Sequence, residues 1–274
     1  MTLRGFCLLL LAFVQTACFE PKKACLDIDA TNFDASADED CCCEYPQLLM
    51  NAVQRYDTLQ YLPDSLYAGT DGRLFRIKKV IFYLSDFQLF QNGGIVMVSD
   101  SVNLKTYAAT GSDTISQTFT DDFVLVRRAP VENEVGDFRP GGTFEKIRFR
   151  LGLSPEAERV IPQLAPSAHP LRIQSDSIWY GRDAGYVFLQ AIVVRDSMAA
   201  TRPDTLSFTK SELSDFFIER TSSFIHQSGG YNFTLTLTVD YKKMFEGVDW
   251  TTGDISTWKS KIATNLPNVF SVSQ

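Results

Sequence analysis

Apolar side chains recur at every second position in several segments of this chain, and this alternation constrains the fold more than any other feature. In residues 231–241, apolar and aromatic residues alternate with Asn, Thr and Asp. Successive side chains of a β-strand point to opposite faces, so this pattern predicts an antiparallel strand with one buried and one solvated face. Residues 144–153 alternate in the same way, through Ile147, Phe149, Leu151 and Leu153.

Other strands are indicated by longer apolar runs. Residues 80–84 and 186–194 are almost continuously apolar, which is typical of central strands. Residues 122–127 predict a further strand. Glycine-containing turns at 92–94, 139–142 and 229–230 separate these runs.

Helix signals are few. Ser154 followed by Pro155 predicts a helix of one or two turns ending near residue 160. Trp258, Ile262 and Leu266 recur every four residues, which predicts a short amphipathic helix near the C-terminus. We therefore expect an all-β fold over residues 47–274, a two-layer antiparallel β-sandwich with short peripheral helices, including the C-terminal one.

The first 17 residues predict an export signal. Arg4 precedes nine apolar residues, Phe6 to Val14, whereas a bilayer-spanning helix needs about 20. Residues 15–18 resemble a bacterial lipobox, although Gln15 stands where an aliphatic residue is usual. We expect residues 1–17 to be a lipoprotein signal peptide, with Cys18 diacylated and anchored to the outer membrane of a bacterial cell envelope, on its periplasmic or surface face. The alternative is ordinary secretion with cleavage nearby.

Residues 18–46 are predicted to form a lipidated tether and an acidic, cysteine-rich segment. Residues 24–45 carry seven acidic and no basic side chains. Four cysteines bracket them, and in an exported protein they favour disulfides over thiolate metal sites; they are Cys25, Cys41, Cys42 and Cys43. Adjacent cysteines rarely pair, so we expect Cys25 to pair with one of the other three. The remaining two are then strained together or free.

The same segment resembles short Cys-, Asp- and Asn-containing modules of bacterial surface and secreted proteins. Its side-chain oxygens suit Ca²⁺, which takes six to eight hard oxygen ligands. The candidate calcium ligands are Asp27, Asp29, Asn32, Asp34 and Asp38. The segment lacks the Gly and the final Glu of an EF-hand loop. The alternative is a solvated acidic spacer held by disulfides.

Several functional classes find no support. The net charge is −7 and no basic patch stands out, so we expect no nucleic-acid partner. There is no Gly-x-Ser-x-Gly elbow, no phosphate-binding glycine loop and no His-Glu-x-x-His. We therefore expect that the protein is not an enzyme.

The chain has only two histidines, His169 and His226. Two imidazoles can bind copper or zinc if the fold brings them together. The alternative is that each is a surface or capping histidine.

The order of several segments carries a family resemblance. Residues 78–89, Lys-Lys-Val-Ile-Phe-Tyr-Leu-Ser-Asp-Phe-Gln-Leu, resemble the first block of the MbnP-like domain, a copper-binding family named from methanobactin operons. Further similarity follows in order at 144–153, at 169–171, at the aromatic segment ending in 185–188, at His226 and in the tail from 244 to 270. The resemblance covers about residues 47–274.

This resemblance implies an exported protein that holds or delivers copper, often paired with a dihaem, peroxidase-like partner. In some relatives that partner oxidises a tryptophan to kynurenine, which joins histidine in binding copper. His169 and His226 fall where the family has histidines. Tyr180 stands where tryptophan is usual and Trp179 precedes it, so these two complete the candidate metal set; aromatic packing is the alternative.

Strand alternation would point Trp179 and Tyr180 to opposite faces, which argues against a kynurenine-dependent site. This departure favours a second hypothesis. In it, the chain is a surface adhesion or interaction module on a β-sandwich that has lost the metal site.

Overall fold

A computed structural model describes residues 20–98, 100–108, 113–173, 178–198, 200–213, 215–227 and 229–274. The predicted signal peptide and the predicted lipid attachment at Cys18 lie outside the described residues. No described helix has the length and apolar character needed to cross a bilayer.

Among the described residues, eight strands form the larger sheet, and all of its pairings are antiparallel. The long central strand β6 (Leu74–Gln91) contains the predicted strand 80–84. The main order is β14 (Asp204–Thr209), β13 (Val187–Val194), β6, β12 (Gly142–Leu151) and β15 (Phe217–His226). Three short strands also pair with β6: β5 (Leu66–Ala68), β7 (Gly94–Met97) and β10 (Val124–Val126).

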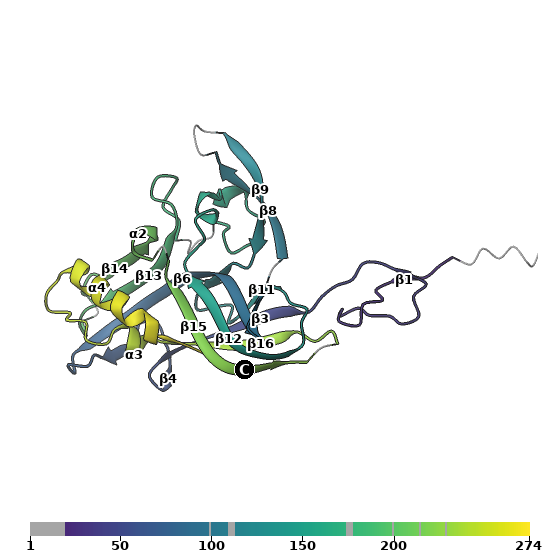
Figure 1. The fold of residues 1–274 in the computed structure, drawn as a ribbon. Helices are drawn as coiled ribbons and strands as arrows, with labels where there is room; N and C mark the ends of the chain where they lie inside the picture. Colours follow the sequence, from purple (N-terminus) through teal and green to yellow (C-terminus); the bar gives the residue numbers. More distant parts are fainter. Residues whose placement is uncertain are drawn as a thin grey trace, which may run out of the picture.

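The second sheet packs against the first. Its order is β11 (Glu132–Asp137), β3 (Gln47–Tyr56), β16 (Phe233–Asp240) and β17 (Phe270–Ser273), and β4 (Leu59–Gln60) also pairs with β3. Rings from the two sheets meet in the core, as where Phe144 contacts Phe233 and Phe82 contacts Phe270. The predicted all-β sandwich is confirmed (Figure 1).

One pairing departs from the expected antiparallel arrangement. Strands β3 and β16 run parallel, with Phe233 opposite Leu48 and Asp240 opposite Arg55. Apolar alternation defines which face of a strand is buried, but it is the same for either strand direction. The second sheet therefore contains one parallel pair among antiparallel pairs.

The edge strands β15 and β17 bring the two sheets together at one side. The side chain of Gln274 accepts a hydrogen bond from the Ile225 N–H and donates one to the Ile225 carbonyl, at 2.7 and 2.6 Å. Arg220 on β15 donates to the Phe270 carbonyl at 2.7 Å. These bonds satisfy part of an otherwise open sheet edge.

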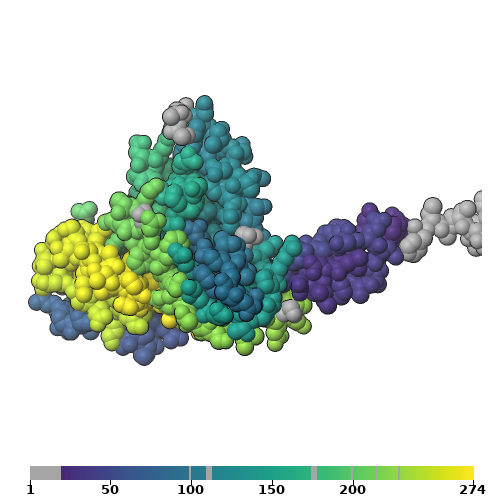
Figure 2. All heavy atoms as spheres, viewed as in Figure 1, coloured from purple at the N-terminus to yellow at the C-terminus, as the bar shows by residue number. Residues whose placement is uncertain are grey.

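The remaining elements are short. A hairpin of β8 (Asp100–Tyr107) and β9 (Thr114–Asp121) stands away from the sheets, and a parallel pair, β1 (Lys23–Ala24) and β2 (Glu39–Asp40), lies in the projecting N-terminal segment (Figures 1 and 2). Within the described residues, the helical elements are η2 (Ala157–Arg159), η3 (Pro162–Leu164), α2 (Lys210–Leu213), α3 (Tyr241–Met244), α4 (Ile255–Asn265) and η4 (Leu266–Asn268).

The predicted C-terminal helix is confirmed as α4. Asp254 caps it by accepting from the Ser256 N–H at 2.9 Å. Trp258 and Ile262 are fully buried, and the Trp258 indole donates to the Asp249 carbonyl at 2.6 Å. Leu266 begins η4 instead of ending α4.

Three expected boundaries are corrected. The helix predicted from Ser154 is only the 3₁₀ turn η2, and the strand predicted at 122–127 is shortened to β10. The strand predicted at 231–241 begins at Phe233 and gives way at Tyr241 to α3, which Asp240 caps by accepting from the Lys242 N–H. Such a capping carboxylate starts a helix even where the apolar alternation continues.

Candidate metal centre

His169 is buried in the loop that follows η3, at 7% exposure. Its Nδ1 accepts the Leu171 N–H at 3.1 Å, and its Nε2 lies 3.0 Å from an Asp121 carboxylate oxygen. Because Nδ1 acts as an acceptor, the neutral ring carries its hydrogen on Nε2 and donates it to Asp121. The Phe123 ring packs edge-on against the imidazole, with centroids 5.7 Å apart. These contacts fix the orientation of the imidazole.

Asp121 and His169 line an open pocket of about 460 Å³ between the hairpin, β10, β11 and the His169 loop. Other acidic side chains on its wall are Asp100, Glu132 and Glu134, and the basic one is Arg127. Asp100 lies directly opposite Asp121 across the β8–β9 hairpin. The excess of carboxylates favours a cation over an anion in this pocket.

Asp122, the next residue after Asp121, is almost fully buried. Burial raises the pKa of its carboxyl to about 7, and the nearby Asp86 and Asp121 charges act in the same direction. The Phe87 N–H donates to Asp122 at 2.8 Å and offsets part of this effect. Asp122 does not line the pocket, and its carboxyl is partly neutral near pH 7.

Asp137 at the end of β11 is paired with Asp100 at the start of β8. Partial burial raises the pKa of Asp137 to about 6, and its hydrogen bond with Asp100 and the Asp100 charge add to the rise, while Arg139 opposes it. Below about pH 6, a proton on Asp137 therefore favours contact with Asp100 and so between the second sheet and the hairpin.

We expect Asp137→Asn to make the folded protein more stable at about pH 8 than at about pH 5, relative to wild type. The pKa of Asp137 is raised above its unfolded value, so its contribution to stability is full below about pH 4 and is lost as the pH rises through about 6. Asparagine keeps a hydrogen-bond donor to Asp100 and removes the repulsion, for a gain of about 1 kcal/mol after allowance for solvent screening. Urea unfolding at the two pH values measures the difference; an equal effect of the substitution at both would contradict it.

His226 lies at the end of β15, opposite Gly142 of β12, and is 4% exposed. Its Nδ1 lies 2.8 Å from the Pro140 carbonyl and its Nε2 lies 2.7 Å from the Tyr231 carbonyl. The rings of Phe138 and Phe233 flank it, with centroids 4.8 and 5.2 Å away. Carbonyl oxygens only accept, so a metal ion at either nitrogen must take the place of a carbonyl.

The two histidines lie in different surroundings. The pocket beside His226 is lined by 225–227, 231–234 and Gln274, and it shares no residue with the pocket beside His169. Within the part of the chain that the structure describes, neither histidine belongs to a group of three or more His, Cys, Asp or Glu side chains with ligand atoms within 4.8 Å. A metal ion shared by both histidines therefore stays a prediction, and each ring is already engaged by protein groups.

Trp179 and Tyr180 differ in burial and in partners. Trp179 forms a β-bridge with Tyr186 and is half-buried against the core. Tyr180 is 55% exposed, and its hydroxyl accepts from the Gln190 amide at 2.6 Å. The Tyr186 hydroxyl donates to the Leu171 carbonyl at 3.0 Å, so this aromatic segment is tied to the loop that carries His169.

Sequence reasoning missed Asp121, the carboxylate beside His169. The two residues are 48 positions apart, and the sequence contains 33 acidic side chains. No local spacing links Asp121 to the histidine. Only the packing of the hairpin against the His169 loop brings them together.

Among the described residues, four of the five candidate calcium ligands already accept hydrogen bonds from protein donors through a side-chain oxygen; Asp29 is the exception. Asp27 accepts from the Asp29 N–H and the Tyr45 hydroxyl, and both bonds lower the pKa of its carboxyl. Asp34 pairs with Lys22 and accepts from Ser36, which hold the pKa of its carboxyl well below its usual range. The remaining candidates are Asp29, whose N–H donates to Asp27, Asn32, whose amide bonds the backbone at Cys42 and Glu44, and Asp38, which accepts from the Lys22 N–H. Calcium binding stays a prediction.

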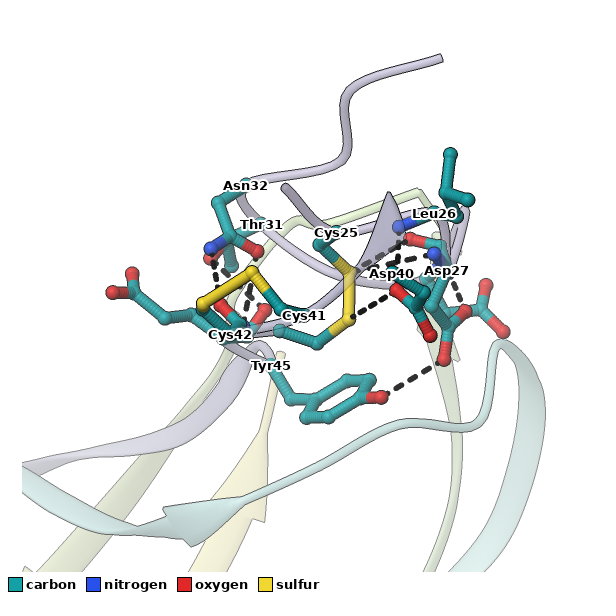
Figure 3. The surroundings of a disulfide bond; sticks show 12 residues. Cys25, Leu26, Asp27, Thr31, Asn32, Asp40, Cys41, Cys42 and Tyr45 are labelled. Atoms are coloured by element: carbon teal, nitrogen blue, oxygen red, sulfur yellow. Dashed lines mark hydrogen bonds between the residues drawn. A yellow bond between two sulfur atoms is a disulfide. The ribbon is translucent and has the colours of Figure 1, made fainter. Parts of the chain in front are cut away.

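The cysteines form two disulfides, Cys25–Cys43 and Cys41–Cys42 (Figure 3). Cys25 joins one of the three consecutive cysteines, as expected, and the two that remain pair with each other. The sulfurs of Cys25 and Cys43 and a carboxylate oxygen of Asp40 lie within 4.8 Å of one another. Both sulfurs are held in a disulfide, so they offer no thiolate to a metal ion.

The part of the chain that contains both histidines is similar to a known protein family. A family model described as MbnP matches residues 47–260. Among solved structures, MbnP from Methylosinus trichosporium is 13% identical to this chain, with 73% of this chain and 78% of that chain covered and a TM-score of 0.40. A search of curated proteins found no match.

Proposed function

We propose that this chain, which belongs to the MbnP family, is an exported, lipid-anchored protein that holds or delivers copper and has no catalytic activity of its own. The observation that carries the proposal is the family match over residues 47–260, which includes both histidines. In this proposal, copper is the ion that the protein carries and not a catalytic cofactor. A dihaem, peroxidase-like protein is the partner that we propose.

The pocket beside His169 supports copper binding best. An imidazole nitrogen and a carboxylate oxygen face each other there at 3.0 Å on an acidic wall. Imidazole suits copper, which also has the highest affinity among the divalent ions of its row for such ligands. Asp121 either shares a cation held at Nε2, where the metal replaces the hydrogen of that nitrogen, or orients the ring from outside while the cation at Nδ1 displaces the Leu171 N–H.

The N-terminal segment supports the proposed anchoring. Residues 20–46 project from the sandwich to one side (Figure 2). One of its contacts with the body is the Arg139 guanidinium over the Tyr45 ring at 3.5 Å. A projecting segment of this kind would separate the copper pocket from a lipid surface at Cys18.

Copper uptake by the whole exported chain tests the proposal. We expect the oxidised chain to retain about one equivalent of copper against dialysis, because one imidazole–carboxylate pair lines the pocket. The dialysis buffer contains no other copper-binding protein, and a copper-binding dye measures the metal that the chain retains. Failure to retain either Cu(I) or Cu(II) would contradict it.

That negative outcome would favour the second candidate function, a surface adhesion or interaction module. The observation that favours it is the separation of the two histidines into pockets without a common residue. The exposed Tyr180 where the family has tryptophan adds to it.

A further inference from the structure

The Cys41–Cys42 disulfide joins two neighbouring residues, so it cross-links no other part of the fold. A disulfide stabilises a protein mainly by closing a loop of the unfolded chain, and this effect grows with the length of the loop. Between neighbours there is no loop to close. A role in stability therefore does not account for this bond.

The other disulfide has a clear structural role. Cys25 is fully buried, its carbonyl accepts the Asp34 N–H at 2.8 Å, and it forms a β-bridge with Phe33. Its bond to Cys43 closes a loop with a sequence separation of 18 residues. Cys25–Cys43 thus holds the acidic segment together whatever the state of its neighbours.

The two bonds differ in how accessible one sulfur is. Cys42 is exposed and Cys41 and Cys43 are half-buried, whereas Cys25 has no exposed surface. Exchange requires a thiolate to reach a sulfur atom, so exposed disulfides are the ones that reductants open. Figure 3 shows the Cys41–Cys42 bond beside the disulfide of Cys25.

The backbone around the pair is held independently of the disulfide. The Cys41 N–H donates to the Ala24 carbonyl at 3.1 Å. The Asn32 side chain holds the backbone that follows Cys41. Its amide donates to the Cys42 carbonyl at 2.7 Å, and its oxygen accepts the Glu44 N–H at 3.0 Å. Opening the disulfide would therefore leave two thiols on a backbone that stays in place.

We propose that Cys41 and Cys42 form a reduction-gated site for a soft metal ion such as Cu(I). A thiolate of an external dithiol reductant attacks one of the two sulfurs and forms a mixed disulfide. The second thiol of the reductant then releases it, so the reductant is oxidised to its disulfide while Cys41 and Cys42 gain two electrons and two protons. Both thiols lose their protons when they bind the metal ion.

The chemistry of the pair sets its ligand class. Thiolate sulfur selects soft ions such as Cu(I) over Ca²⁺ or Mg²⁺. The site lies outside the region matched by the family and does not rest on the proposed histidine site. Reduction would add a second, sulfur-based position for a cation to the chain.

The first test locates the reducible bond. The full exported chain is treated with a limiting dithiol, alkylated rapidly and digested, and the labelled cysteines are identified by mass spectrometry. We expect label on Cys41 and Cys42 while Cys25 and Cys43 stay paired. Equal or earlier labelling of Cys25 would overturn the proposal.

The second test measures metal uptake. Cu(I) is titrated against a chromophoric chelator before and after the same reduction, under exclusion of oxygen. We expect reduction to add one equivalent of bound Cu(I) in wild type and none in Cys41→Ser/Cys42→Ser. This variant keeps the Cys25–Cys43 disulfide. The gain should persist in His169→Ala/His226→Ala, which separates this site from the histidine site. An unchanged capacity of the reduced wild-type chain would overturn the proposal.

Discussion

Replacing Gly152 with alanine is expected to lower the free energy of unfolding by about 4 kcal/mol. Gly152 follows β12 and has φ +122°, a conformation that side-chain-bearing residues rarely adopt. A methyl group there would overlap the Phe188 ring, with Cγ at 2.7 Å and Cε2 at 2.8 Å. Phe188 is fully buried, so it cannot swing away; backbone strain and overpacking each add about 1–3 kcal/mol.

Gly93→Ala is the matched control for this measurement. Gly93 also has positive φ, +76°, but no atom lies within 4 Å of its added Cβ. Only the conformational cost remains, so a loss of about 1 kcal/mol is expected. Urea unfolding of the two variants separates steric overlap from backbone strain, and equal losses in both would contradict the packing that we describe around Phe188.

His169→Ala is expected to weaken copper binding by at least about 100-fold, and Asp121→Asn by about 10- to 100-fold. Removing the imidazole deletes a ligand, whereas replacing a carboxylate that orients it has the smaller effect measured for outer partners of metal ligands. Because Nε2 of His169 faces Asp121 at 3.0 Å, the two substitutions act on one site. Competition with a copper-binding dye measures both affinities.

His226→Ala is the comparison variant for these two copper affinities. Both His226 nitrogens face backbone carbonyls and its ring packs between Phe138 and Phe233, so its loss should reduce stability more than copper affinity. Circular dichroism before each titration shows which variants are folded. If His226→Ala abolished copper binding in a folded protein while His169→Ala kept it, the assignment to the His169 pocket would be wrong.

Much of the fold follows from the sequence because local patterns determine which side of each element is buried. The alternation in β16 places Phe233, Leu235, Leu237 and Val239 in the core, and the spacing of Trp258 and Ile262 does the same for α4. The parallel pairing of β3 with β16 could not be predicted in this way. It is decided by contacts between residues almost 200 positions apart, for which the alternation gives no direction.

The candidate site is less predictable than the fold. His169 and His226 stand out because the chain has no other histidine, but their rarity does not say where they lie. Asp121 matters because it faces His169, and that contact depends on how the hairpin packs. The pairing of Cys25 with Cys43, in preference to Cys41 or Cys42, likewise required the folded segment.

The decisive measurement is a copper titration of His169→Ala/His226→Ala beside wild type, because this variant lacks both imidazoles of the chain in one oxidised, folded protein. We expect wild type to bind about one equivalent of copper and the double variant to lose this equivalent, while both unfold cooperatively. Undiminished stoichiometry and affinity in the double variant would contradict a copper site built on these histidines.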